Sequence, residues 1–229
     1  MTRSTRIGII SGAIAGVVIL IVVIVIAVVL RLATAPPATG TRDVTTSDVT
    51  PLTRGDTHVL GEPGASEVTV VEFLDFECEA CGAFYPYVEQ LRKDYAGEVT
   101  FAFRYFPLPG HGNAQNAAAA VEAAAQQDQL EPMYQRMFET QAEWGERGSD
   151  SQADRFRGYA KDLGLNVTQY DRDVASGRVA DRIQRDIDDG TALGIQSTPS
   201  FFVDGKLLQL TSYDDLDTAI ADALERRSR

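Results

Sequence analysis

The sequence predicts an α/β fold that is interrupted by a long helical insertion. Two β-rich runs, Val68–Leu74 and Val99–Phe106, flank a segment with helical spacing, which is typical of a β-α-β unit. Residues 113–193 then show helical patterns and almost no strand signal. Two short strand signals and one amphipathic helix close the chain, so the predicted order is β-α-β, a helical block, and β-β-α.

The N-terminal residues 1–31 predict one transmembrane helix. Ile7–Leu30 holds 24 residues without a charge, more than the roughly 20 that a helix needs to cross a bilayer. An uncleaved anchor fits this length better than a signal peptide, although Ala33–Ala35 has the small-x-small pattern of a cleavage site. Residues 32–57 are rich in Ala, Thr and Pro and predict a flexible extracytoplasmic linker. We therefore expect a single-pass protein of the cell membrane, with its N-terminus cytoplasmic and its C-terminal domain outside.

After the linker, the domain is expected to be built around the buried central strand Val68–Leu74, with an edge segment near Val59. A helix should follow over residues 78–95, with Pro86 inside it. Val99–Phe106 alternates as a strand does. Because a helix connects the two strands, we expect them to be parallel.

Five helices are predicted in the insertion, over residues 113–127, 132–144, 151–163, 166–177 and 178–193. Large apolar side chains at helical spacing should form the core of this block: Met133, Tyr134, Met137, Phe138 and Trp144. The chain should then close with a hairpin over residues 200–210, turning at Asp204-Gly205, and a helix over residues 214–226.

The charge balance argues against two classes of partner. The chain totals 21 − 33 = −12, and residues 1–31 hold three arginines and no acid, so residues 32–229 total 18 − 33 = −15. An acidic domain has no electrostatic footprint for nucleic acid or for anionic lipid. We therefore predict no nucleic-acid partner.

The only two cysteines, Cys78 and Cys81, form a C-x-x-C pair at a predicted helix start. Free N–H groups and the helix dipole stabilise a thiolate at such a position. Structural zinc would need two further ligands, and the chain offers only His58 and His111. Covalent haem would need a histidine where Gly82 stands. An inert disulfide is the remaining alternative, but closing so short a loop stabilises little, so a redox-active pair is favoured.

Three sequence stretches follow the predicted transmembrane helix in this order: VEFLDFECEAC, FRYFPLPGH before an alanine-rich helix, and GIQSTPSFFVDGK. Together they resemble the DsbA family of exported thiol–disulfide oxidoreductases, of the thioredoxin-fold superfamily, in its membrane-anchored bacterial branch. The resemblance covers residues 58–226. It implies a thioredoxin fold with an all-helical insertion at about residues 111–194.

The resemblance assigns roles to five positions. Cys78 corresponds to the exposed nucleophile and Cys81 to the buried resolving cysteine. Glu72 corresponds to a buried carboxylate that relays the proton of Cys81, the alternative being a strand residue on a wetter face. Thr198-Pro199 corresponds to a cis peptide whose backbone pairs with an extended client.

This chain departs from the strongly oxidising relatives, which place a proline and a histidine between the cysteines. Glu79-Ala80 stands there instead, and the charge of Glu79 by itself disfavours a thiolate on Cys78. We therefore expect a milder oxidant. His111 is a candidate for the rim of the site, since its loop follows a parallel strand, although a merely structural role is the commoner one for such a histidine.

The predicted function is the formation of disulfides in unfolded or partly folded exported proteins that carry thiols. It would need no cofactor and no metal beyond the redox-active Cys78–Cys81 disulfide, and a membrane redox partner would reoxidise it. A reductase or isomerase on the same face and a binding or chaperone module with a structural disulfide are the alternatives. No dimerisation module is visible in the sequence, so we expect a monomer.

Overall fold

The structure, a computed structural model, describes residues 52–145, 148 and 150–229. Its strands are His58–Leu60 (β1), Thr69–Leu74 (β2), Thr100–Tyr105 (β3), Ser200–Val203 (β4) and Lys206–Leu207 (β5). They form one sheet in the order β1-β3-β2-β4-β5. β2 and β3 are parallel, as predicted, and the other neighbouring pairs are antiparallel. The strand that leads to the cysteines therefore lies at the centre of the sheet.

The predicted anchor Ile7–Leu30 lies outside the described residues, and so does most of the predicted linker. Within residues 52–145, 148 and 150–229, no helix combines the length and apolar character needed to span a membrane. The transmembrane helix therefore stays a prediction from the sequence.

The helices are Glu79–Asp94 (α2), Ala114–Ala125 (α3), Leu130–Glu139 (α4), Gln141–Trp144 (α5), Ala153–Asp162 (α6), Val167–Val174 (α7), Gly177–Ala192 (α8) and Asp214–Arg227 (α9). The helix predicted over residues 132–144 is in fact two, α4 and α5. The break falls at Thr140, whose hydroxyl donates to the carbonyl oxygen of Arg136 at 2.7 Å and shares it with the Thr140 N–H, an arrangement that bends a helix. The second hairpin strand is also shorter than predicted, because only Lys206–Leu207 pairs with β4.

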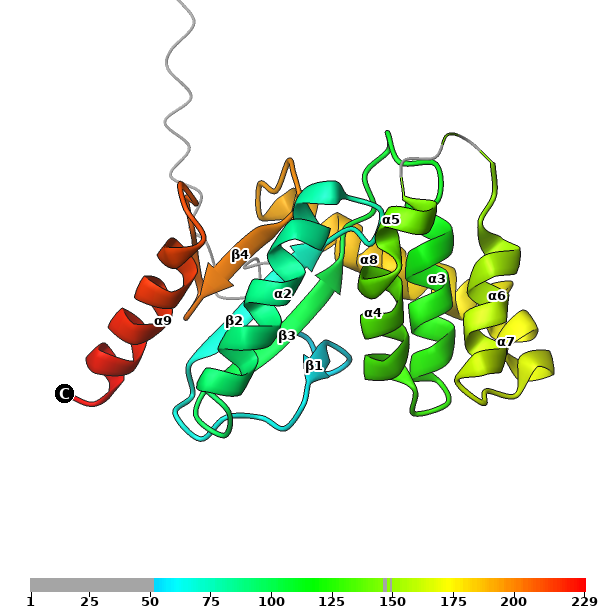
Figure 1. Ribbon diagram of the computed structural model, residues 1–229. Helices are drawn as coiled ribbons and strands as arrows, with labels where there is room; N and C mark the ends of the chain where they lie inside the picture. The colour runs from blue at the N-terminus through cyan, green and yellow to red at the C-terminus, as the bar shows by residue number, and fades with distance from the viewer. Residues whose placement is uncertain (1–51, 146–147, 149) are drawn as a thin grey trace, which may run out of the picture. The chain divides into compact units, whose positions relative to one another are not determined.

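Helices cover both faces of the sheet (Figure 1). α2 and α9 share one face, where apolar residues of both helices pack on Val70 of β2 and Phe201 of β4. α8 lies on the opposite face, against Val71 and Phe73. Because side chains alternate along a strand, Glu72 points to the face that α2 covers. The helical insertion, α3 to α7, stands beside the sheet.

The core of the insertion forms as predicted around large apolar side chains. Met133, Tyr134, Met137 and Trp144 are 0% exposed, and Phe138 is 6% exposed. The alanine-rich helix α3 lies among them, because small side chains let α4, α6, α7 and α8 approach it closely. The rings of Trp144 and Phe156 meet edge to face, with centroids 4.8 Å apart.

Buried ion pairs fix α8 to the sheet. Arg104 of β3 is 0% exposed and pairs with both Asp186 and Asp189 of α8. Asp189 also accepts from Arg54 at 2.5 Å. The described end of the predicted linker, residues 52–57, is therefore bound to the domain through Arg54. Because each buried charge has an opposite charge beside it, removing one partner would leave a charge uncompensated.

Candidate active site

The cysteine pair lies where the central strand passes into α2. Cys78 is the N-cap residue of that helix, with extended backbone angles, and its carbonyl oxygen accepts from the N–H of Gly82 at 3.1 Å. Cys81 follows in the first turn. Both are free cysteines in this structure. Cys78 is 8% exposed and Cys81 is 0% exposed, so the nucleophile is more enclosed than expected but still more accessible than its partner.

The loop before β4 completes the site. The Thr198–Pro199 peptide bond is cis, and the Cys78 thiol donates to the carbonyl oxygen of Thr198 at 3.4 Å. The hydroxyl of Thr198 is also buried, and it can donate to the sulfur when Cys78 is a thiolate. The loop therefore places both a backbone carbonyl and a hydroxyl beside the reactive sulfur.

The surroundings separate the two thiols in acidity. A hydrogen bond from the Cys81 thiol outweighs the opposing effect of burial and, with Thr198 and the N–H groups of Ala80 and Cys81, lowers the pKa of Cys78 to about 5. Burial, the bond to Cys78 and the charge of Glu72 raise the pKa of Cys81 well above its usual value. The pair is thus arranged so that Cys78 is the thiolate and Cys81 keeps its proton near neutral pH.

Glu72 lies on β2 beneath the cysteines and is 4% exposed. Burial, followed by the negative charges of Cys78 and Glu89, raises the pKa of Glu72 to about 8. The same electrostatic coupling links Glu72 to Cys81. A buried carboxyl with a pKa near neutrality can both give and take a proton, as a relay requires.

Two further buried acids hold the segment before Cys78. The Asp75 carboxylate accepts from the N–H groups of Glu77 and Leu108, each at 2.8 Å, and Nδ1 of His111 lies 2.6 Å from it. The carboxylate of Glu77 accepts from the N–H of Asn113, just before α3, at 2.5 Å. The loop after β3 is thereby fixed to the turn that carries the nucleophile.

Gln141 of α5 contacts the same turn from the helical insertion. Its side-chain amide donates to the carbonyl oxygens of Phe76 and Cys78, both at 2.8 Å. The amide reaches them across Gly82, where a Cβ atom would lie 1.9 Å from Oε1 of Gln141. Glycine at position 82 is therefore needed for this contact.

The two residues between the cysteines, Glu79 and Ala80, are both exposed. Water screens the charge of an exposed carboxylate, so Glu79 opposes the Cys78 thiolate only weakly. The stabilising hydrogen bonds come instead from the Cys81 thiol, from Thr198 and from the helix start.

A groove of about 360 Å³ opens beside the cis peptide. Its lining includes Ser197, Pro199, Ser200 and residues 207–210. β5, at the edge of the sheet, borders this groove. An extended chain could lie here and reach the backbone of Thr198.

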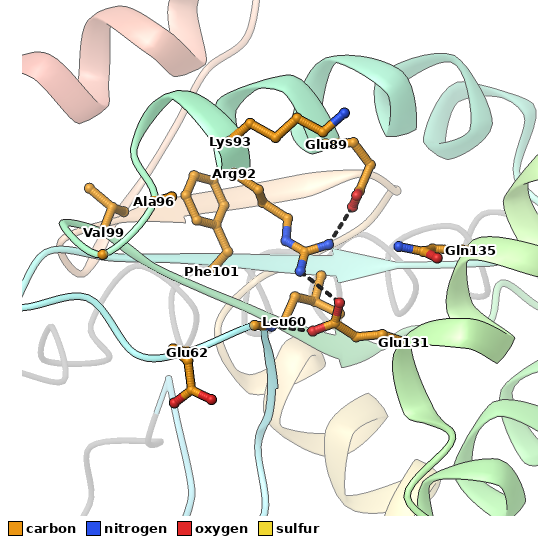
Figure 2. A pocket seen from close by; sticks show the side chains of 12 residues that line it. Leu60, Glu62, Glu89, Arg92, Lys93, Ala96, Val99, Phe101, Glu131 and Gln135 are labelled. Atoms are coloured by element: carbon orange, nitrogen blue, oxygen red, sulfur yellow. Dashed lines mark hydrogen bonds and ion pairs between the residues drawn. The ribbon is translucent and has the colours of Figure 1, made fainter.

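A second pocket, of about 500 Å³, lies at the opposite end of α2 (Figure 2). Figure 2 shows Arg92 between two carboxylates; its guanidinium is 2.6 Å from Glu89 and 3.0 Å from Glu131. Because its arginine is already paired and the cysteines lie at the start of α2, the pocket contributes no group to thiol exchange. Among the described residues, no cluster of three or more histidine, cysteine or acidic side chains could hold a metal ion.

The structure thus brings together Cys78, Cys81, Glu72, Thr198 and Pro199 and places His111 at their rim through Asp75. Sequence reasoning missed two groups of contacts, those made by the buried acids of the D-F-E-C segment and those made by Gln141. The acids carried a signal, since Asp75 and Glu77 alternate with apolar residues directly before the nucleophile. Gln141 carried none, because its contact depends on how the insertion packs.

Comparisons with known proteins agree with this geometry. Residues 53–222 match the thioredoxin family. A thioredoxin-like oxidoreductase from Silicibacter pomeroyi superposes with a TM-score of 0.64 at 27% identity, covering 78% of this chain and 98% of that one. Oxidised BdbD from Bacillus subtilis superposes with a TM-score of 0.64 at 25% identity, covering 74% and 93%.

The curated relatives are much longer proteins. A Na⁺/H⁺ antiporter NhaA from Herminiimonas arsenicoxydans is 34% identical over 173 residues, which is 75% of this chain but 26% of that protein. The chain thus spans about a quarter of such relatives, and the antiport activity in their name is not carried over. The family match, the fold and the cysteine pair agree: the chain belongs to the thioredoxin family.

Proposed function

We propose that this protein is an oxidase that donates its Cys78–Cys81 disulfide to exported proteins. The observation that carries the proposal is the stabilised thiolate of Cys78, whose pKa is lowered to about 5 by hydrogen bonds from Cys81, Thr198 and the helix start. Stabilising the thiolate stabilises the reduced protein, and this makes the disulfide a stronger oxidant.

The same observation sets the expected strength of the oxidant. The corresponding cysteine has a pKa of about 7 in thioredoxin and about 3.5 in DsbA. A value of about 5 lies between them. We therefore expect a reduction potential between the roughly −270 mV of thioredoxin and the roughly −120 mV of DsbA, in keeping with a milder oxidant.

In the reaction, a client thiolate attacks the sulfur of Cys78 and breaks its bond to Cys81, forming a mixed disulfide. The released Cys81 thiolate takes a proton, and the buried carboxyl group of Glu72 donates it. A second client thiolate then attacks the client sulfur of the mixed disulfide, and Cys78 leaves as a stable thiolate. The groove beside Pro199 is the place for an extended client segment.

The place of action follows from the N-terminal sequence. Ile7–Leu30 supports a domain that is anchored in the cell membrane and works on its outer side. We expect this domain to be a monomer. There it would meet unfolded or partly folded clients with thiols, and a membrane redox partner would restore its disulfide.

Equilibration with glutathione buffers tests the proposal, together with oxidation of a reduced, unfolded client by the purified chain. We expect a potential within the stated range and client oxidation that Cys78→Ser abolishes. A potential at or below about −270 mV would instead indicate a reductase, and one at or above about −120 mV would contradict the milder strength. A Cys78 no more reactive than free cysteine would favour the binding or chaperone module.

A further inference from the structure

His111 is held beside the active-site turn by a buried carboxylate. Its Nδ1 lies 2.6 Å from Oδ2 of Asp75, whose side chain is 0% exposed, while the imidazole itself is 19% exposed. Asp75 also binds the chain at Cys78, because its carbonyl oxygen accepts from the Cys78 N–H at 3.1 Å. One residue therefore contacts both the histidine and the nucleophile, and water can still reach the ring.

The hydrogen bonds of Asp75 define the proton state of this pair. Its two carboxylate oxygens accept from the N–H groups of Glu77 and Leu108, which leaves His111 as the third donor. Nδ1 of the ring therefore carries a hydrogen, and the other nitrogen, Nε2, is the one that gains or loses a proton. Gaining it converts the ring into an imidazolium.

The charged groups around His111 favour that cation. Burial lowers the pKa of His111, but the bond to Asp75 and the negative charges of Asp75, Cys78 and Glu77 together raise it above its usual value. Asp75 and Glu77 are side chains of the turn in both redox states. The charge of Cys78 exists only when the disulfide is open, so the reaction itself changes the field that acts on the ring.

We propose that His111, held by Asp75, is the cationic partner of the Cys78 thiolate and supplies the positive charge that Glu79-Ala80 does not. Asp75 is its positioning residue. The inference deepens the proposed function and rests on its thiol exchange, but not on the direction of that exchange.

The proton balance of the reaction gives the histidine a further task. A client dithiol that becomes a disulfide releases two electrons and two protons. The Cys78–Cys81 bond takes both electrons, and one proton goes to the sulfur of Cys81, while Cys78 stays a thiolate near neutral pH. The second proton has no place on sulfur, and Nε2 of His111 takes it up in the fraction of molecules whose ring was neutral.

The redox dependence of the histidine titration tests this directly. The full-length chain has only two histidines, so ¹³C-labelled imidazole signals can be followed by NMR in the oxidised and in the reduced protein. We expect the pKa of His111 to be higher in the reduced protein, because the charge of the Cys78 thiolate favours the imidazolium. The signals of His58, which lies 2.6 Å from Glu122, are the internal control and should be the same in both redox states. Equal titration of His111 in both states would overturn the proposal.

A variant gives the reciprocal measurement. Coupling between two sites is mutual, so His111→Gln should raise the pKa of the Cys78 thiol by the amount that reduction raises that of His111. The glutathione equilibrium should then shift toward the oxidised protein. The shift should be roughly tenfold, which corresponds to about 30 mV, for each unit by which the pKa of Cys78 rises. Asp75→Asn should act in the same direction, and His58→Gln should leave the thiol unchanged.

The outcomes separate the possible errors. A merely structural His111 would change the melting temperature of His111→Gln but not the acidity of Cys78. If the wild-type potential proves to be that of a reductase, the oxidase direction fails, while a redox-dependent His111 would still stand. If the histidine titration shows no redox dependence, only its role as charge partner fails.

Discussion

The thiol of Cys78 donates a hydrogen bond to the carbonyl oxygen of Thr198, 120 residues further along the chain, at 3.4 Å. This contact joins the two halves of the thioredoxin fold across the helical insertion. It also places the groove beside Pro199 close to the reactive sulfur, because Pro199 follows Thr198 directly. The reactivity of the first half therefore depends on the position of the second.

The pH profile of alkylation should show this reactivity. With its pKa lowered to about 5, Cys78 in the reduced protein is largely thiolate from about pH 6 upward, so iodoacetamide should react with it at nearly constant rate between pH 6 and 8. Cys81 should stay unmodified, because burial raises its pKa. Thr198→Val removes a hydroxyl from beside the sulfur and should move the midpoint upward. A midpoint near 8.5, the value of free cysteine, would contradict the described site.

The free energy of unfolding should decrease as pH rises, because Glu72 loses its proton. Its pKa is raised from 4.5 in the unfolded chain to about 8 in the folded one, so its contribution is complete below pH 4.5 and is lost as pH rises toward 8. Glu72→Gln lacks this titration and should gain on the wild type by about 3 kcal/mol between pH 4.5 and 7. Urea denaturation of both reduced proteins at several pH values measures the difference. A difference that does not vary with pH would show that Glu72 is not buried as described.

The same variant should slow thiol exchange if Glu72 relays the proton of Cys81. Glutamine cannot accept that proton, so the attack of Cys81 on a mixed disulfide should slow by roughly 10²-fold, the lower end for general base catalysis. Stopped-flow decay of a mixed disulfide between Cys78 and a small thiol measures this step. An unchanged rate in Glu72→Gln would assign the proton transfer to water.

The effect of Gly82→Ala on stability should change sign when Gln141 is also replaced. Gly82→Ala places a methyl group against Oε1 of Gln141 and should destabilise the fold by about 1–3 kcal/mol. Gln141→Ala frees that space but leaves two carbonyl oxygens without their side-chain donor. In that background Gly82→Ala should become stabilising by about 0.5–1 kcal/mol, since alanine suits a helix better than glycine. The four chemical denaturation curves of this cycle measure the reversal; additive effects would contradict the contact.

Much of the fold could be predicted because its signals are local. The β-branched run of Val68–Leu74 indicated the central strand, and Asp204-Gly205 indicated the hairpin turn; both residues have positive φ, as such a turn requires. The sequence also indicated the order of strands and helices, since each element carries its own apolar period. Cys78, Cys81 and the residues before Pro199 lie in such local patterns.

The rest depends on contacts between distant segments. Arg104 lies in a strand that alternates like any other, yet it is fully buried because α8 brings Asp186 and Asp189 to it. No local pattern around Arg104 in the sequence predicts those partners. The contact of Gln141 with the cysteine turn has the same origin, and the break at Thr140 follows from a single hydroxyl that an apolar period does not reveal.

The redox state of Cys78 and Cys81 in living cells tests the central claim most directly. Acid quenching followed by alkylation with a mass-tagged maleimide separates the oxidised chain from the reduced one, and Cys78→Ser marks the position of the chain without the pair. An oxidase waiting for clients is kept as the disulfide by its redox partner, so we predict that most of the chain carries the Cys78–Cys81 bond. A chain found mostly as two free thiols would contradict the proposed oxidase and indicate a reductase.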